Sequence, residues 1–128
     1  MRPRKPILLY CADRELLSTT AFALRLHPYE VIAIESCADA ALLAGGTGAV
    51  FACCVLLHAQ QGDMAGRLIY RLLEVAAHIP ILLIDRAGDL APVRYADMVL
   101  YGRNTSMAHI LGALKALCAR KRGPRSAA

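Results

Sequence analysis

The stretch from Phe51 to Gly66 reads Phe-Ala-Cys-Cys-Val-Leu-Leu-His-Ala-Gln-Gln-Gly-Asp-Met-Ala-Gly. Its first seven residues are apolar without alternation, and this run is too short for a buried helix. Such a run is typical of a strand that is covered on both faces, as at the centre of a parallel sheet. In open α/β sheets, ligands bind beyond the carboxyl ends of the strands. We therefore expect any chemistry of the fold near His58, where this strand ends.

Four other short apolar runs predict buried strands. They lie at residues 7–10, 31–34, 81–84 and 98–101. Residues 87–95 lack apolar periodicity and contain Gly88 and Pro92, so at most a short helix or a turn is expected there.

Helices are predicted between these strands. Apolar residues recur every three or four positions in three segments, 16–24, 64–76 and 107–118. A short Ala- and Leu-rich helix is predicted after Ser36. Asp13 and Ser36 are expected to cap the first two helices, and Asn104, Thr105 or Ser106 the last. The alternation of strand and helix predicts a parallel sheet with helices on both faces.

The chain has 128 residues, which fits one domain that buries a sizeable core. We expect a basic arm at residues 1–6, the folded domain at 7–118 and a basic, flexible tail at 119–128. The two ends hold 8 of the 15 basic residues, so the body carries 7 basic against 10 acidic residues. The basic residues of the ends are Arg2, Arg4, Lys5, Lys115, Arg120, Lys121, Arg122 and Arg125. The body is therefore mildly acidic, and only its ends are basic.

No apolar run approaches the ~20 residues that a helix needs to cross a bilayer. The basic N-terminus is followed by an apolar run of only strand length, which differs from a signal peptide. We therefore predict a cytoplasmic protein without membrane contact. The five cysteines show no C-x-x-C pair and no zinc-ligand spacing, so reduced core thiols are expected.

Four short sequence details accompany this order of elements. Met64 and Gly66 follow His58 by six and eight residues, Tyr-Glu-Val opens the second strand, Ile-Pro-Ile opens the fourth, and Ala-Asp precedes the fifth. With these details, residues from about 7 to 118 resemble the receiver domain of bacterial two-component response regulators. The resemblance implies a single-domain, flavodoxin-like three-layer sandwich with a five-stranded parallel sheet of order 2-1-3-4-5. The segment before the fifth strand is short for this family and implies a shortened fourth helix.

The positions that carry chemistry in that family hold other residue types in this chain. The family uses an acidic pair after the first strand for magnesium, an aspartate after the third as phosphoacceptor, a Ser or Thr after the fourth and a Lys after the fifth. The resemblance matches these positions, in that order, to Cys11 and Ala12, His58, Asp85 and Gly102. The switching aromatic residue of the fifth strand is matched by Val99.

These replacements remove the chemistry of phosphoryl transfer. A thiol and a methyl group supply none of the hard oxygen ligands that magnesium needs. Phosphoryl transfer depends on positioning and on neutralising charge, and neither magnesium nor the lysine is expected here. We therefore predict no aspartyl phosphorylation, no enzymatic activity, no cofactor and no metal. His58 and Asp85 are expected to form a hydrogen-bonded pair in the space that metal and phosphate would occupy.

The resulting hypothesis is a receiver-like signalling module that acts by protein–protein interaction, independently of phosphorylation. Its interaction surface is expected over the last helix, the fifth strand and the segment before it. Tyr95, Met98 and Tyr101 are the candidates for an exposed apolar strip there. Homodimerisation through this surface is left open.

Three alternatives remain at this point. Cys11, His58 and Asp85 end neighbouring strands, so they could line a pocket that senses a small molecule or a soft metal, or form a nucleophile set. His58 could itself accept a phosphoryl group. The basic tail could associate weakly with nucleic acid by counterion release, although the sequence shows no motif for specific recognition.

Overall fold

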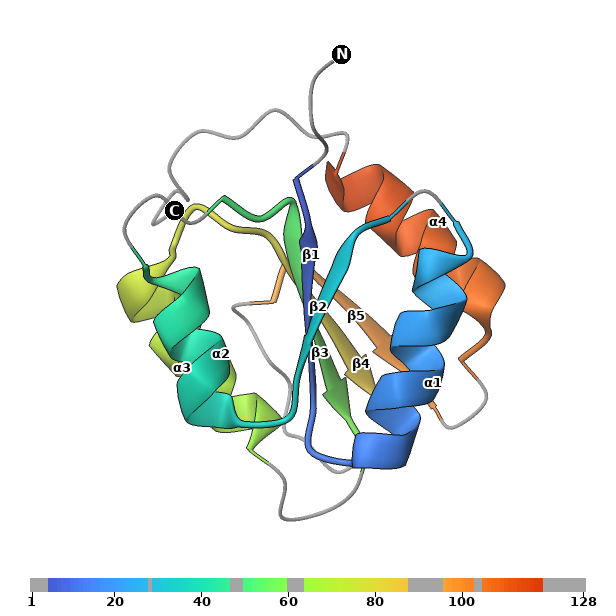
Figure 1. The fold of residues 1–128 in the computed structure, drawn as a ribbon, viewed down its shortest axis with the longest axis horizontal. Helices are drawn as coiled ribbons and strands as arrows, with labels where there is room; N and C mark the ends of the chain where they lie inside the picture. The colour runs from blue at the N-terminus through green and yellow to red at the C-terminus, as the bar shows by residue number, and fades with distance from the viewer. Residues whose placement is uncertain are drawn as a thin grey trace.

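The described part of the chain contains five strands and four helices, and Figure 1 shows their arrangement. The computed structural model describes residues 5–27, 29–46, 50–59, 64–87, 96–102 and 105–118. Its strands are β1 (Ile7–Cys11), β2 (Val31–Ile34), β3 (Cys53–His58), β4 (Ile81–Asp85) and β5 (Met98–Tyr101). The helices of this part are α1 (Arg14–Arg25), α2 (Cys37–Ala44), α3 (Ala65–Val75) and α4 (Met107–Cys118). The predicted turn or shortened helix at residues 88–95 lies outside the described residues.

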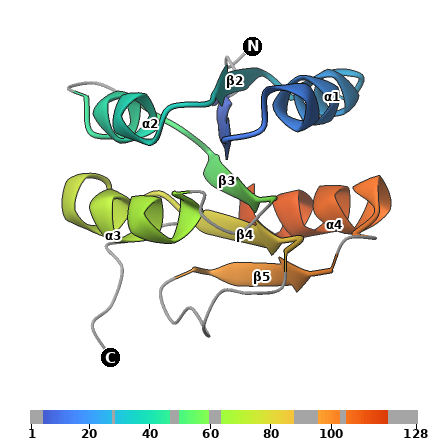
Figure 2. The ribbon, with the colours of Figure 1, turned by 90° about the horizontal axis from the view of Figure 1, so that it is seen from below.

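All five strands are parallel and form one sheet of order β2-β1-β3-β4-β5. This order confirms the predicted flavodoxin-like topology. The crossovers from β1 to β2, from β2 to β3 and from β3 to β4 each pass a helix over one face of the sheet, and α4 follows β5, so helices cover both faces. Figure 2, which views the sheet from the carboxyl ends of its strands, shows α1 and α4 on one side and α2 and α3 on the other.

The central strand begins later than its apolar run. Its pairing with β1 starts at Ile7 and Cys53, and the N–H of Ala52 donates to the carbonyl of Pro6 at 3.0 Å. Proline has no N–H to extend the ladder further, so Phe51 and Ala52 lie before the strand. The prediction of a strand from residue 51 is therefore wrong at its start. Its last residue is His58, where the sequence predicted that the strand ends.

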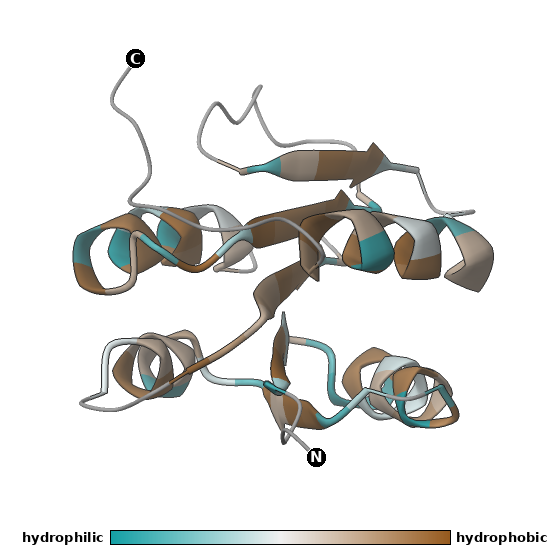
Figure 3. Cartoon of the chain, turned by 90° about the horizontal axis from the view of Figure 1, so that it is seen from above, coloured by the Kyte–Doolittle hydropathy of each residue, from teal (hydrophilic) through white to brown (hydrophobic). Residues whose placement is uncertain are grey.

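The side chains of the strands form two separate apolar layers, one on each face of the sheet, because successive side chains of a strand point to opposite faces. The layer under α1 and α4 includes Leu9, Val55 and Ile84. The layer under α2 and α3 includes Leu8 and Leu56. Figure 3 shows the hydrophobic sheet between helices whose outer faces are more polar. Full burial of each such side chain contributes about 1.5–3 kcal/mol, so the two layers dominate the stability of the fold.

Side-chain caps begin three of the helices, as predicted. The Asp13 carboxylate accepts from the N–H of Leu16 at 3.1 Å, and the Ser36 hydroxyl accepts from the N–H of Asp39 at 3.2 Å. Ser106 caps α4, since its hydroxyl accepts from the N–H of His109 at 3.2 Å. These bonds satisfy helix N–H groups that have no partner within the helix.

Candidate functional site

The register of the sheet brings His58 and Asp85 together at its carboxyl edge. His58 is the Cα partner of Asp85, and Asp85 is in turn the partner of Tyr101. Only 2% of His58 and 1% of Asp85 is exposed, and both take part in further interactions. Side chains two residues apart in a strand point to the same face. His58 therefore shares the face of Leu56 in β3, and Asp85 shares the face of Leu83 in β4. Both side chains therefore belong to the face of the sheet that α2 and α3 cover.

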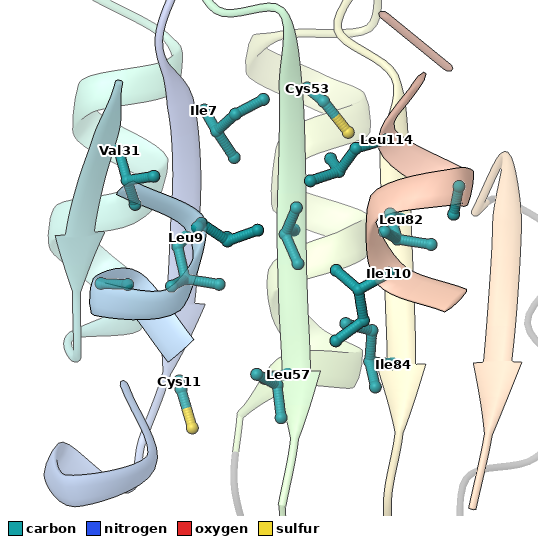
Figure 4. Close-up of a cluster of buried hydrophobic side chains, with 14 of the residues drawn as sticks. Ile7, Leu9, Cys11, Val31, Cys53, Leu57, Leu82, Ile84, Ile110 and Leu114 are labelled. Atoms are coloured by element: carbon teal, nitrogen blue, oxygen red, sulfur yellow. The ribbon is translucent and has the colours of Figure 1, made fainter. Parts of the chain in front are cut away.

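Cys11 ends the neighbouring strand, but on the other face. Its Cα partner is Leu57, not His58, and its side chain is fully buried in the layer under α1 and α4. Figure 4 shows Cys11 beside Leu57 in that layer, with Ile84 farther along it. The structure thus brings His58 and Asp85 together and separates Cys11 from them by the thickness of the sheet. Sequence reasoning placed the three at one edge without counting which face each side chain takes.

The residues that follow β1 offer no free carboxylate to this edge. Ala12 is exposed and carries only a methyl group. The carboxylate of Asp13 caps α1 through the N–H of Leu16. Among the described residues, no group of three or more His, Cys, Asp or Glu side chains is arranged to hold a metal ion.

Gly102, at the position matched to the lysine of the family, adopts a left-handed backbone with φ of +100°. Its N–H donates to the carbonyl of Asp85 at 3.0 Å, and its own carbonyl accepts from the Thr105 hydroxyl at 2.9 Å. A side chain added here would meet open space, so the constraint is the backbone alone. Residues with a Cβ are disfavoured at such a φ, and a lysine would therefore be strained.

Arg86, which sequence reasoning left without a role, lies next to the His58 and Asp85 pair. Its N–H donates to the carbonyl of His58 at 3.0 Å, and the N–H of Ala87 donates to the same oxygen at 3.3 Å. The chain thus turns tightly over the end of β3 as it leaves β4. The position of Arg86 directly after Asp85 was the sequence feature that could have indicated this role. The turn itself depends on the pairing of β3 with β4.

The residues proposed for an apolar strip do not share one face. Met98 packs against the layer under α1 and α4, whereas Val99 packs against the opposite layer. Tyr101 follows the parity of Val99 and is 66% exposed. Tyr95 lies outside the described residues. Tyr101 is the exposed aromatic side chain that the structure places at this end of β5.

The five cysteines are free thiols. Burial raises the pKa of the Cys53 thiol far above its ordinary value, and burial also raises the pKa of Cys118. Burial raises the pKa of Cys37 as well, although Arg71 and Arg67 partly oppose this effect. Cys53 and Cys54 belong to opposite layers, as predicted from their adjacency in one strand. A raised pKa favours the neutral form of the Cys37, Cys53 and Cys118 thiols, and a neutral thiol is a poor nucleophile and metal ligand.

No family model matches the sequence. No curated protein matches it. None of the described helices has the length and apolar character needed to span a membrane.

Solved structures do match. A response regulator receiver domain protein from Clostridium thermocellum has a TM-score of 0.78 at 12% identity, covering 90% of this chain and 94% of that one. A CheY-like receiver domain protein from Methanospirillum hungatei has a TM-score of 0.72 at 15% identity, covering 91% and 94%. A structure from Rhodopirellula baltica, described as an adenylate cyclase, has a TM-score of 0.77 at 20% identity, covering 91% and 88%.

The chain is thus an α/β domain of the flavodoxin-like class, with both faces of a parallel sheet covered by helices. Within that class, its fold is that of response regulator receiver domains. At these identities the likeness concerns the fold, and the function has to be argued from the carboxyl edge of the sheet.

Proposed function

We propose that this chain is a receiver-like signalling module that acts through a protein partner and without phosphoryl transfer. The observation that carries the proposal is the pairing of His58 with Asp85 at the edge where the family holds its phosphoacceptor. Both side chains are almost fully buried, so neither presents an acceptor to solvent.

The chemistry around this pair supports the same proposal. Magnesium binds through one or two carboxylates with several waters, and the end of β1 supplies a buried thiol from Cys11 and a methyl group from Ala12. The left-handed backbone at Gly102 disfavours any side chain at the end of β5, including that of a lysine. Among the described residues, the charges of a bound magnesium and of the family's lysine are thus missing, and phosphoryl transfer depends on such charges. We accordingly propose no enzymatic activity and no cofactor for the domain.

The partner surface that we propose comprises α4 and the end of β5. Tyr101 is 66% exposed, and aromatic side chains contribute strongly to protein interfaces. His109 and Lys115 on α4 are also exposed, beside the small residues Ala108 and Gly112. Because Tyr101 shares the sheet face of Val99 and α4 covers the opposite face, a partner would contact the aromatic side chain and the helix on either side of the β5 edge.

The experiment is to expose the folded protein to acetyl phosphate and, separately, to beryllofluoride, each with and without magnesium. We expect no phosphoryl mass increment and no shift in the amide NMR spectrum. The His58→Asp variant restores the acceptor alone and is expected to stay silent, because the metal ligands are still missing. A magnesium-dependent mass increment in the wild-type protein would contradict the proposal.

A second measurement distinguishes this proposal from the alternative in which Cys11, His58 and Asp85 form a pocket that senses a soft metal. Thermal shift is recorded with zinc for the wild type and for His58→Ala. Cys11 faces the opposite layer and cannot share a zinc ion with His58. We therefore expect zinc to leave the melting temperature unchanged for the wild type and for His58→Ala alike. A zinc-dependent stabilisation of the wild type that His58→Ala abolishes would favour the sensor over the interaction module.

A further inference from the structure

Strand β2 forms an open edge of the sheet, as Figure 1 and Figure 2 show. Its four residues, Val31–Ile34, are all apolar and include neither proline nor a charged side chain. An edge strand exposes unpaired N–H and C=O groups, which are a template for another strand. Ile32 adds exposed apolar surface beside this edge, with 38% of its surface accessible.

The hydrogen bonds show which backbone groups face outward. The carbonyl of Glu30 accepts from the N–H of Ile7 at 2.7 Å and therefore faces β1. Successive residues of a strand direct their backbone groups to opposite sides. The N–H and C=O groups of Val31 and Ala33 therefore face the open edge, while those of Ile32 face β1.

A side chain of α1 covers part of this edge. Nη2 of Arg25, in the last turn of α1, donates to the Val31 carbonyl at 2.7 Å, in a partly buried bond. A second arginine of the same helix, Arg14, instead pairs with the Glu35 carboxylate at 3.1 Å, where both side chains are well exposed. Arg25 thus bonds the edge backbone itself, whereas Arg14 bonds a side chain beyond the end of the strand.

We propose that the open edge of β2 is a self-association surface that fits the β2 strand of a second copy of this chain, and that Arg25 keeps it closed. An antiparallel register that pairs Val31 with Ala33 of the second copy uses the outward backbone groups of both strands. It places Ile32 against Ile32 of the second copy, so that its exposed apolar surface becomes buried. Glu30 then lies opposite Ile34 of the second copy, so no two carboxylates face each other. The Val31 carbonyl cannot complete this register while the Arg25 guanidinium lies over it.

The test compares two variants that remove the same charge from the same helix, Arg25→Met and Arg14→Met. Molecular mass is measured by sedimentation velocity over a range of protein concentrations, with circular dichroism to verify folding. We expect Arg25→Met to double its mass relative to the wild type at high concentration, and Arg14→Met to behave as the wild type does. Arg25→Lys, which keeps a donor, is expected to restore the wild-type mass.

A second substitution locates the association. Ala33→Pro removes an N–H that faces the open edge and leaves the bonds to β1 in place, so it should abolish the association of Arg25→Met. Arg25→Gln, whose side chain is too short to reach the carbonyl, repeats the comparison if Arg25→Met fails to fold. The proposal is overturned if both Arg25 variants keep the wild-type mass, or if Ala33→Pro leaves their association unchanged. It is also overturned if Ala33→Pro alone dissociates the wild type, because the edge would then already be paired.

Discussion

Asp97 and Ile81 are joined by two hydrogen bonds at the start of the last two strands. The Asp97 carboxylate accepts from the N–H of Ile81 at 2.7 Å, and the N–H of Asp97 donates to the Ile81 carbonyl at 2.9 Å. The side chain thus supplies the acceptor that the first residue of β4 needs before β5 begins. This double contact aligns the two strands that carry Asp85 and Tyr101 to the opposite edge.

Removal of the Asp97 carboxylate should therefore destabilise the end of the sheet. We expect Asp97→Ala to lower the free energy of unfolding by about 1–3 kcal/mol, because the buried Ile81 N–H loses its acceptor. Asp97→Asn keeps an oxygen that can accept this bond, so the free energy of unfolding should fall less than for Asp97→Ala. Urea denaturation of the two variants measures the difference, and equal losses would contradict the assigned acceptor.

The contact between α2 and α3 predicts an asymmetry between two glycines. A Cβ built on Gly45 would lie 2.8 Å from the Val75 Cβ, whereas one built on Gly112 would meet open space. Gly45→Ala should therefore destabilise the fold, while Gly112→Ala in α4 should stabilise it by about 0.5–1 kcal/mol through helix propensity. Thermal denaturation compares the two variants. A neutral Gly45→Ala variant would contradict the close approach.

The left-handed backbone at Gly102 predicts that an aliphatic side chain is costly there. We expect Gly102→Ala to lower the free energy of unfolding by about 1–2 kcal/mol. Gly102→Asn should cost less, since asparagine tolerates this conformation better. Chemical denaturation of both variants is the measurement. If alanine and asparagine cost the same, backbone strain is not the cause.

The raised pKa of Cys53 predicts a loss of stability in alkaline solution. In the unfolded chain this thiol ionises near its ordinary pKa of 9.0, whereas in the folded chain burial holds it neutral to higher pH. Above that ordinary pKa the unfolded state binds fewer protons than the folded state, so stability falls as pH rises. The slope that Cys53 contributes reaches about 1.4 kcal/mol per pH unit. From about pH 8 to about pH 10.5, roughly 2.5 units across the transition, the free energy of unfolding should fall less steeply for Cys53→Ala than for the wild type. Parallel slopes would contradict this.

The coupling of His58 with Asp85 can be measured by a double-mutant cycle. Each single substitution to Ala leaves a buried polar partner behind, whereas the double substitution removes both. We expect a coupling of about 0.5–3 kcal/mol in the free energy of unfolding, because residues in contact are not additive. Additive losses would show that the two side chains are satisfied by other partners.

The apolar runs predicted the strands because a strand that is buried on both faces is apolar at every position. In the structure, strand pairing extends three of these runs by one residue at the end, to Cys11, His58 and Asp85. The start of β3 was missed because it depends on Pro6, a residue distant in sequence. The face taken by Cys11 could have been counted from Ile7, since alternate residues share a face. The position of Cys11 relative to His58 could not be predicted, because it depends on the register between β1 and β3.

Other features arise only from tertiary contact. Arg25 reads as an ordinary basic residue in the last turn of a helix, and its bond to Val31 requires α1 to pack beside β2. The left-handed φ of Gly102 is one of several conformations open to any glycine, and the bond to Asp85 selects it. Local sequence carries no signal for either contact.

The bond from the Gly102 N–H to the Asp85 carbonyl ties the interior of the sheet edge to the chain segment that leads into α4. Thr105 continues this connection through its N–H to the Gly102 carbonyl, one residue before the Ser106 cap. The path runs through main-chain atoms, so replacing the side chain of Asp85 leaves it intact. The end of β4 and the start of α4 are therefore linked by the main chain alone, whichever side chain stands at position 85.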